Sequence, residues 1–234
     1  MNKYEINDET SYSLGMSLTI EAIKHKPEYV RQVILSDKVL KNDQFSYLND
    51  LCDENNIETI YDNKLIDKLS LKENCYCIGI FDKFYTPLQN NNHIVLYGFN
   101  DFGELGTVLR SSVSFDFKDI VLIDSDIDYF DPRCVRSSMG SIFHTNIVSY
   151  ESFEDYFNDY PSQKIYSFVS ESDNELSDMK LAEPFSLLIS QNYYALDDKF
   201  ENQYMLKHKE KEEISLSIRS SIILSVAYYL KRNL

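Results

Sequence analysis

The sequence predicts an α/β protein with a parallel sheet covered by helices. Short apolar runs of strand length alternate with helical segments along the 234 residues, which is typical of a parallel sheet buried on both faces. Six glycines and five prolines are few for a loop-rich all-β protein. With 43% hydrophobic residues, the chain can bury a substantial core.

The first third of the chain predicts one compact unit. Apolar residues at helical spacing predict helices over residues 14–23, 43–54 and 62–69, and continuous apolar runs predict strands over 30–35, 57–61 and 75–81. Residues 82–92 contain Pro87, three consecutive asparagines and no periodicity, as a linker does. We therefore expect a first domain at residues 1–85, a linker at 86–92 and a second domain at 93–234.

In the second domain, strands are expected over 93–99, 119–124, 146–150, 164–169 and 185–190, with helices over 103–115, 132–139 and 152–159 and a long final helix. In that last helix one apolar stripe recurs every fourth residue and is expected to be buried: Ile214, Ile218, Ile222, Val226 and Leu230. Ile223 and Ala227 widen the apolar face. Both a core helix and a helix in a dimer interface fit this pattern.

Charge and composition exclude several classes of protein. The 23 basic and 38 acidic residues give a net charge of −15, which argues against a generic nucleic-acid binder held by counterion release. The N-terminus has no apolar signal core, and no apolar stretch is long enough to span a membrane. Four irregularly spaced cysteines indicate free thiols in a reducing compartment. We expect a cytoplasmic protein without membrane contact.

No metal site is expected. Cys75 and Cys77 have no second ligand pair nearby, and the aspartates of residues 116–131 lack the glycine and terminal glutamate of a calcium loop. The four histidines are scattered along the chain: His25, His93, His144 and His208. Glycine-rich phosphate loops and nucleophile elbows are also absent from the sequence.

Two arginine-bearing segments follow expected strands, at residues 100–112 and 131–143. In the first, Gly106 and Arg110 are one helical turn apart. Two arginines at helix starts beside adjacent strands suit the binding of an oxyanion or phosphate.

These residues carry a family resemblance. The order Gly106-x-x-x-Arg110, the block at 135–143 and the final block at 215–224 resemble the motifs of the SpoU/TrmH RNA ribose 2′-O-methyltransferases of the SPOUT class. Gly15 with Glu21-Ala22-Ile23 is similar to the opening of the L30e-like domain attached to many members. The resemblance implies an L30e-like substrate-binding domain, a SPOUT-type α/β domain with a C-terminal trefoil knot, and a homodimer through the knot helices.

The resemblance also implies site roles. S-adenosylmethionine would be the cofactor and RNA, either rRNA or tRNA, the substrate. Arg110 would activate the ribose hydroxyl or hold the neighbouring phosphate, with Glu104 beside it, and Arg136 and Ser138 would belong to the substrate edge. The cofactor cradle would comprise Leu188, Ile189, Ser190, Gln191, Ala195, Leu196, Leu216, Ser217 and Ser221.

The sequence departs from the family pattern in ways that leave alternatives open. Glu104 stands where the family has asparagine, and residues 190–195 contain none of the glycines of the second motif. Residues 101–140 hold four basic and eight acidic residues, which disfavours RNA on that face. A catalytically silent homologue that acts as a binding or regulatory module is the main alternative. A third is a small-molecule site lined by Tyr193 and Tyr194.

Overall fold

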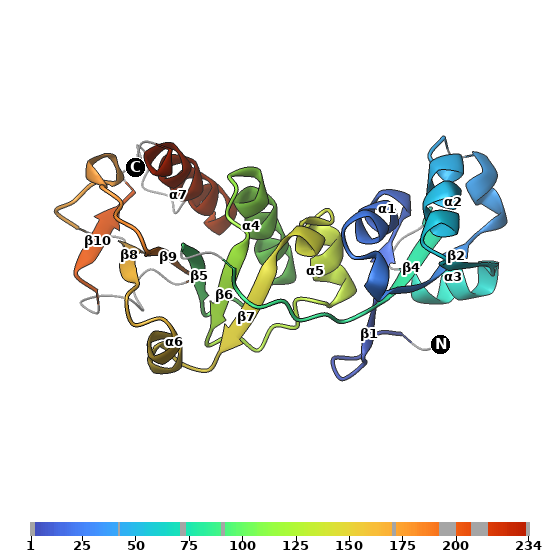
Figure 1. Ribbon diagram of the computed structural model, residues 1–234, viewed down its shortest axis with the longest axis horizontal. Helices are drawn as coiled ribbons and strands as arrows, with labels where there is room; N and C mark the ends of the chain where they lie inside the picture. Colours follow the sequence, from blue (N-terminus) through green and yellow to red (C-terminus); the bar gives the residue numbers. More distant parts are fainter. Residues whose placement is uncertain are drawn as a thin grey trace. The chain divides into compact units, whose positions relative to one another are not determined.

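The computed structural model describes residues 3–41, 43–70, 74–89, 92–169, 172–191, 200–206 and 215–232. Contacts divide the chain into two units (Figure 1). The first comprises Met1–Phe84 and Asp128–His144, and the second comprises Tyr85–Ile127 and Thr145–Leu234. Residues 128–144 were expected in the second domain, whereas their contacts assign them to the first unit.

The first unit is a four-stranded mixed sheet with helices. Its strands, in the order β1-β4-β2-β3, are β1 (Thr10–Leu14), β4 (Cys77–Asp82), β2 (Val30–Leu35) and β3 (Glu58–Tyr61). The pair β2–β3 is parallel, and β4 runs antiparallel to both β1 and β2. The helices are α1 (Met16–His25), α2 (Phe45–Glu54), α3 (Asn63–Leu69) and α5 (Pro132–Ser137). Strand β1 was not expected from the sequence.

Aromatic packing holds residues 128–144 in the first unit. The rings of Phe81 and Phe143 are 5.2 Å apart and those of Phe84 and Phe130 are 5.0 Å apart, and all four side chains are buried. Lys83 donates to Asp128 over 2.8 Å. Since buried aromatic rings contribute most of their stabilisation through area removed from water, this cluster fixes the 128–144 segment.

The second unit is built on a six-stranded sheet in which every neighbouring pair is parallel. The strand order is β10-β8-β9-β5-β6-β7. The strands are β5 (His93–Tyr97), β6 (Asp119–Ile123), β7 (Asn146–Tyr150), β8 (Lys164–Val169), β9 (Phe185–Ser190) and β10 (Asn202–Met205). The helices are α4 (Phe102–Ser114), α6 (Phe153–Asp159) and α7 (Leu216–Lys231). The expected α/β fold with a parallel sheet is confirmed.

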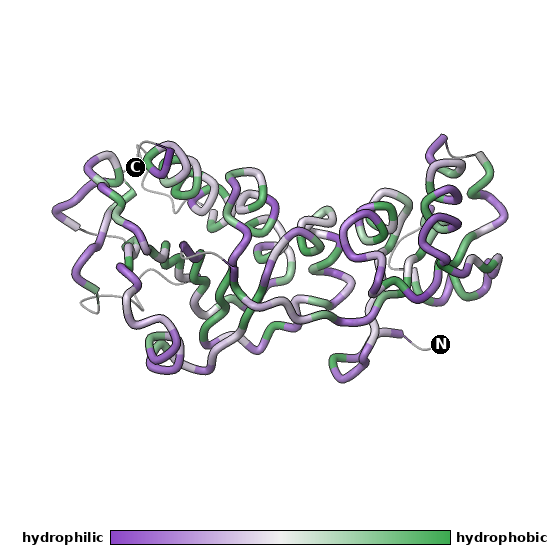
Figure 2. Tube along the Cα trace, in the orientation of Figure 1, coloured by the Kyte–Doolittle hydropathy of each residue, from purple (hydrophilic) through white to green (hydrophobic). Residues whose placement is uncertain are grey.

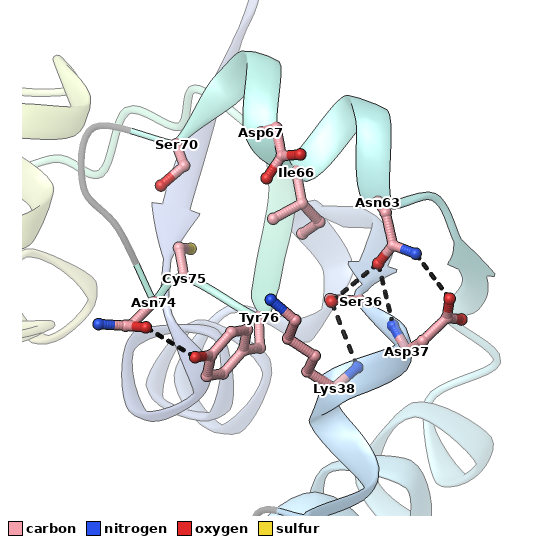
Figure 3. Close-up of a pocket in the computed structure, with 10 residues that line it drawn as sticks. All are labelled: Ser36, Asp37, Lys38, Asn63, Ile66, Asp67, Ser70, Asn74, Cys75 and Tyr76. Carbon is pink, nitrogen blue, oxygen red and sulfur yellow. Dashed lines mark hydrogen bonds between the residues drawn. The ribbon is translucent and has the colours of Figure 1, made fainter.

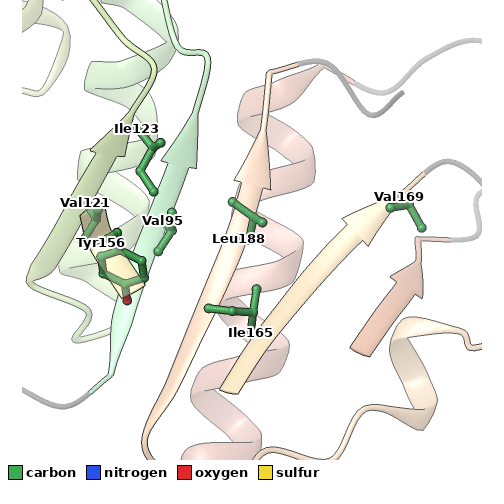
Figure 4. Close-up of a cluster of buried hydrophobic side chains, with 7 residues drawn as sticks. All are labelled: Val95, Val121, Ile123, Tyr156, Ile165, Val169 and Leu188. Atoms are coloured by element: carbon green, nitrogen blue, oxygen red, sulfur yellow. The ribbon is translucent and has the colours of Figure 1, made fainter. Parts of the chain in front are cut away.

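Alternate side chains of these strands fill an apolar core. Val95, Val121, Ile165 and Leu188 pack with Tyr156 of α6, and Figure 4 shows this cluster across the strands. The adjacent residues of the same strands, such as Ile94 and Leu187, point to the opposite face of the sheet and are also fully buried. Burial on both faces explains the continuous apolar runs in the sequence, which appear as hydrophobic stretches of the chain trace in Figure 2.

The burial of α7 corrects one expectation. Ile218, from the stripe expected to be buried, is 55% exposed, and Ile222, Val226 and Leu230 are only partly buried. Ile214 lies outside the described residues. The buried face instead comprises Leu216, Arg219, Ser220, Ile223, Leu224 and Ala227. The reason is that α7 packs against α4, and this contact selects the second apolar face of the helix.

Among the described residues, no helix is long and apolar enough to cross a membrane.

Candidate functional site

The carboxyl edge of the six-stranded sheet contains a topological switch point. From β5 the chain continues to β6 and β7 on one side, whereas β9, β8 and β10 lie on the other. In open parallel sheets, ligands bind where the strand order reverses, outside the carboxyl ends of the strands. Here that place is between the ends of β5 and β9, after Tyr97 and Ser190.

The backbone is open where β5 ends. Gly98 has a φ of +70°, a conformation that favours glycine, and its N–H donates to the Ile123 carbonyl over 3.0 Å. Among the described residues, no atom lies within 4 Å of a Cβ atom built on Gly98. This part of the structure therefore leaves space beside Gly98 at the switch point.

Polar side chains join the two strands beyond their ends. The Asn100 N–H donates to Gln191 Oε1 over 2.9 Å, and Gln191 Nε2 donates to Asn100 Oδ1 over 2.8 Å. The Gln191 N–H donates to the Tyr97 carbonyl over 3.0 Å. Gln191, one of the predicted cofactor residues, is thus held in a defined position at the switch point.

Helix α4 begins at the same edge. Asp101 caps it by accepting from the Glu104 N–H over 2.8 Å. Arg110 is exposed on this helix, and among the described residues its guanidinium forms no ion pair or hydrogen bond. Glu104 is half-buried and, within the same residues, does not pair with Arg110. Six positions separate the two, which places them on different helix faces, so the Arg110 charge is available to a ligand.

Helix α7 is tied both to β9 and to α4. Arg219 is 4% exposed, and its Nη2 donates to the Ser190 carbonyl over 2.7 Å. The Oγ atoms of Ser111 and Ser221 are 2.7 Å apart. Sequence reasoning gave Arg219 no role, because only the fold shows that it reaches the end of β9. These contacts join α4, α7 and the end of β9, which carry three of the predicted motif segments, whereas the block at residues 135–143 belongs to the first unit.

The remaining predicted cofactor residues differ in accessibility. Leu188 and Ile189 are buried strand residues, at 0% and 1% exposure, so their side chains belong to the core. Leu216 is also buried, while Ser217 is half-buried with its Oγ 3.2 Å from that of Ser215. Ala195 and Leu196 lie outside the described residues, as do Tyr193 and Tyr194.

The two predicted substrate residues lie in the first unit. Ser138 is fully buried, and its hydroxyl donates to the Val135 carbonyl over 2.7 Å. Arg136 is half-buried in the last turn of α5. The hydroxyl of Ser138 is therefore hydrogen-bonded within the protein interior. Of these two residues, Arg136 is the more accessible to a substrate.

The first unit also holds a polar cavity of about 710 Å³ (Figure 3). Asn63 organises one wall by accepting from the Ser36 hydroxyl over 2.8 Å and donating to Asp37 over 2.6 Å. Lys38 lies over the Tyr76 ring, 5.9 Å from its centroid. One lysine beside two aspartates, Asp37 and Asp67, does not make a phosphate site.

A second group in the first unit was not visible in the sequence. Glu21 and His25 of α1 meet His144, and the two imidazole centroids are 3.8 Å apart. Burial, followed by the charge of His144, lowers the pKa of His25; Glu21 opposes this effect, whereas Lys24 and Lys26 add to it. No periodicity signals this cluster, because 119 positions separate His25 from His144.

Comparison with known proteins identifies relatives. Residues 91–200 match the model of the SpoU rRNA Methylase family, which confirms the resemblance carried by the motifs. The 23S rRNA (guanosine(2553)-2'-O)-methyltransferase RlmP of Bacillus subtilis (strain 168) is 23% identical over 138 residues, which cover 56% of this chain. The matched region spans about half of that relative, 54% of its length.

Solved structures share the fold. The AdoMet-bound rRNA methyltransferase from Sinorhizobium meliloti matches with a TM-score of 0.77 at 18% identity, covering 97% of this chain and 88% of its own. The SpoU methyltransferase AviRb from Streptomyces viridochromogenes, in complex with AdoMet, matches with a TM-score of 0.80 at 14% identity. This match covers 97% of the present chain and 92% of the AviRb chain. At these identities the likeness establishes the fold.

Proposed function

We propose that this chain is an RNA 2′-O-ribose methyltransferase that uses S-adenosylmethionine, starting from the match of residues 91–200 to the model of the SpoU rRNA Methylase family. One observation carries the proposal: three of the four motif segments, at residues 106–110, 190–195 and 215–224, begin or lie on elements that contact one another. The Arg219–Ser190 and Ser111–Ser221 contacts bring α7, the end of β9 and α4 together. None of these segments alone would be specific for this family of enzymes.

The described residues fit the cofactor. The open space beside Gly98 lies at the switch point, where such a ligand is expected. Ser190 ends β9, and Gln191 follows it beside Tyr97 and Asn100. We propose that these two residues hold the cofactor with Ser217, Ser221, Ala195 and Leu196. When bound, S-adenosylmethionine supplies an electrophilic methyl group on its sulfonium.

The chain's own part in catalysis is to position the ribose. Methyl transfer needs the 2′-oxygen in line with the methyl group, and the proton of the 2′-hydroxyl must be removed as the new bond forms. Arg110 remains charged at neutral pH and is a poor base, so we propose that it binds the phosphate beside the target ribose and stabilises negative charge on the 2′-oxygen. Glu104 does not neutralise this charge in the described structure.

The acidity of residues 101–140 is less opposed to RNA than a count suggests. Two of the eight carboxylates have partners outside this count: Asp119 is buried and accepts from Asn146, and Asp128 pairs with Lys83. We propose that RNA binds with few phosphate contacts, and therefore with a shallow dependence on salt.

We propose that a second copy of the chain covers the outer face of α4 and α7. A shallow groove of about 410 Å³ lies there, lined by Thr107, Phe115, Ile218, Ile222 and Ser225, among others. Ile218 is 55% exposed in the single chain. Ile218→Glu should convert a dimer into a monomer in light scattering, and an unchanged mass would refute this interface. The C-terminal knot and the L30e-like character of the first unit remain part of the proposal by family resemblance.

Calorimetry and methyl transfer test the enzymatic proposal together. S-adenosylmethionine should bind the full chain, and tritium from its methyl group should appear in a 23S rRNA or tRNA transcript. Arg110→Ala should keep cofactor binding and lower transfer by about 10²–10³-fold. Arg31→Ala, at an exposed arginine of the first unit, is the matched control. Absence of cofactor binding would refute the enzyme and favour the silent homologue.

A further inference from the structure

We propose that Glu21, His25 and His144 form a binding site for a divalent transition metal, with Zn²⁺ the best match. The site lies within the first unit and uses none of the residues assigned to methyl transfer. Imidazole and carboxylate are preferred ligands of zinc, and three protein ligands with an open fourth position make a recognised type of zinc site.

The interatomic distances suit a metal ion. Oε2 of Glu21 is 3.0 Å from His144 Nε2 and 3.5 Å from His25 Nε2. Zinc bonds of 2.0–2.2 Å at tetrahedral angles separate neighbouring ligand atoms by about 3.3–3.5 Å. One ligand atom from each of the three residues lies within 4.8 Å of the others, so a small rotation of the exposed His25 side chain completes the triangle.

Rigid elements hold the ligands. Glu21 and His25 are four positions apart and therefore share one face of α1, whose neighbouring residues Ala22 and Ile23 are fully buried. His144 ends a 3₁₀ turn whose Phe143 is 1% exposed. A site built on anchored elements needs little ordering when the ion binds.

The backbone is shaped for this approach. Gly140 has a φ of +87°, and a Cβ atom there would lie 3.0 Å from Glu21 Cβ. Only glycine lets the turn before His144 come so close to α1 at this φ. The close contact sets the distance between the ligands on the two elements.

Glu21 supplies the negative charge of the cluster, and Lys24 and Lys26 oppose positive charge there. Lys24 Nζ approaches the other carboxylate oxygen, Glu21 Oε1, at 3.8 Å, which leaves Oε2 facing the histidines. His25 lies in the last turn of α1, where the helix dipole favours positive charge. The Glu21 and histidine side chains remain 26–34% exposed, so water can reach the fourth position.

The ion would link two distant parts of the chain. Glu21 and His144 are 123 positions apart, so a bound metal closes the 128–144 segment onto α1. Because the ligands converge only in the folded state, binding should stabilise the first unit.

Metal binding by the full, tag-free chain after removal of bound metal tests the proposal. Zn²⁺ should bind with one-to-one stoichiometry in calorimetry, and Co²⁺ should give the visible absorption of a tetrahedral site. Zinc at 100-fold above its dissociation constant should raise the unfolding midpoint of the first unit by about 10–20 °C. His144→Ala should weaken binding at least ten-fold, and His25→Ala with His144→Ala should abolish it.

Two controls keep the test specific. Glu28→Gln removes an exposed carboxylate outside the cluster and should leave binding unchanged, whereas Glu21→Gln should weaken it. Metal-free melting of each variant establishes that it folds. The proposal is overturned if zinc binds only weakly without saturation, or if the histidine variants bind it as the unchanged chain does.

Discussion

Replacing Arg219 by methionine should destabilise the second unit by about 2 kcal/mol. The side chain is 4% exposed and donates to the Ser190 carbonyl at 2.7 Å. A hydrogen bond from a charged donor contributes about 1.5–3 kcal/mol, which the substitution removes. Methionine preserves the unbranched stem and most of its packing. Arg219→Ala also removes that stem and should cost about 3–4 kcal/mol in total.

Equilibrium urea denaturation followed by far-UV circular dichroism measures this difference. Arg232→Met is the matched control, because it makes the same change in an exposed residue beside the end of α7, where the guanidinium is 5.8 Å from the Tyr228 ring. The control should lose less than about 1 kcal/mol. Equal losses for both variants, or a loss below about 0.5 kcal/mol for Arg219→Met, would refute the anchoring role of Arg219.

Two further predictions concern buried groups. Tyr156→Phe should cost about 1–3 kcal/mol, because its hydroxyl lies 2.8 Å from Nδ1 of the buried His93 and 2.7 Å from Ser186 Oγ; a loss no larger than that of Tyr150→Phe, in the same assay, would contradict it. Burial raises the thiol pKa of Cys52 to about 11 and of Cys77 to about 12, so both stay protonated at pH 8. An aromatic disulfide reagent should label them only after unfolding, and rapid labelling of the native chain would show the burial to be wrong.

The buried strands of the second unit could be predicted closely from sequence. The apolar runs expected over 164–169 and 185–190 coincide with β8 and β9. Continuous apolar residues are required wherever a parallel strand is covered on both faces. Strands β1 and β10 were missed, because TSYSL and NQYM mix polar and apolar residues and become strands through their partners.

The candidate site shows the same division. Arg110 was proposed from its motif and is exposed, whereas Ser138 was proposed by the same means and is fully buried. Sequence resemblance identifies a position and carries no information about its accessibility. Arg219 was missed for the converse reason, since its partner Ser190 is 29 positions away.

By itself, the sequence determined the α/β class, the strands of the central sheet and the family motifs, because these depend on local periodicity and residue type. The tertiary structure decided which face of α7 is buried, that Arg219 meets Ser190, and that Glu21, His25 and His144 converge. Contacts between residues far apart in the chain are fixed by the packing of whole elements, and no local pattern encodes them.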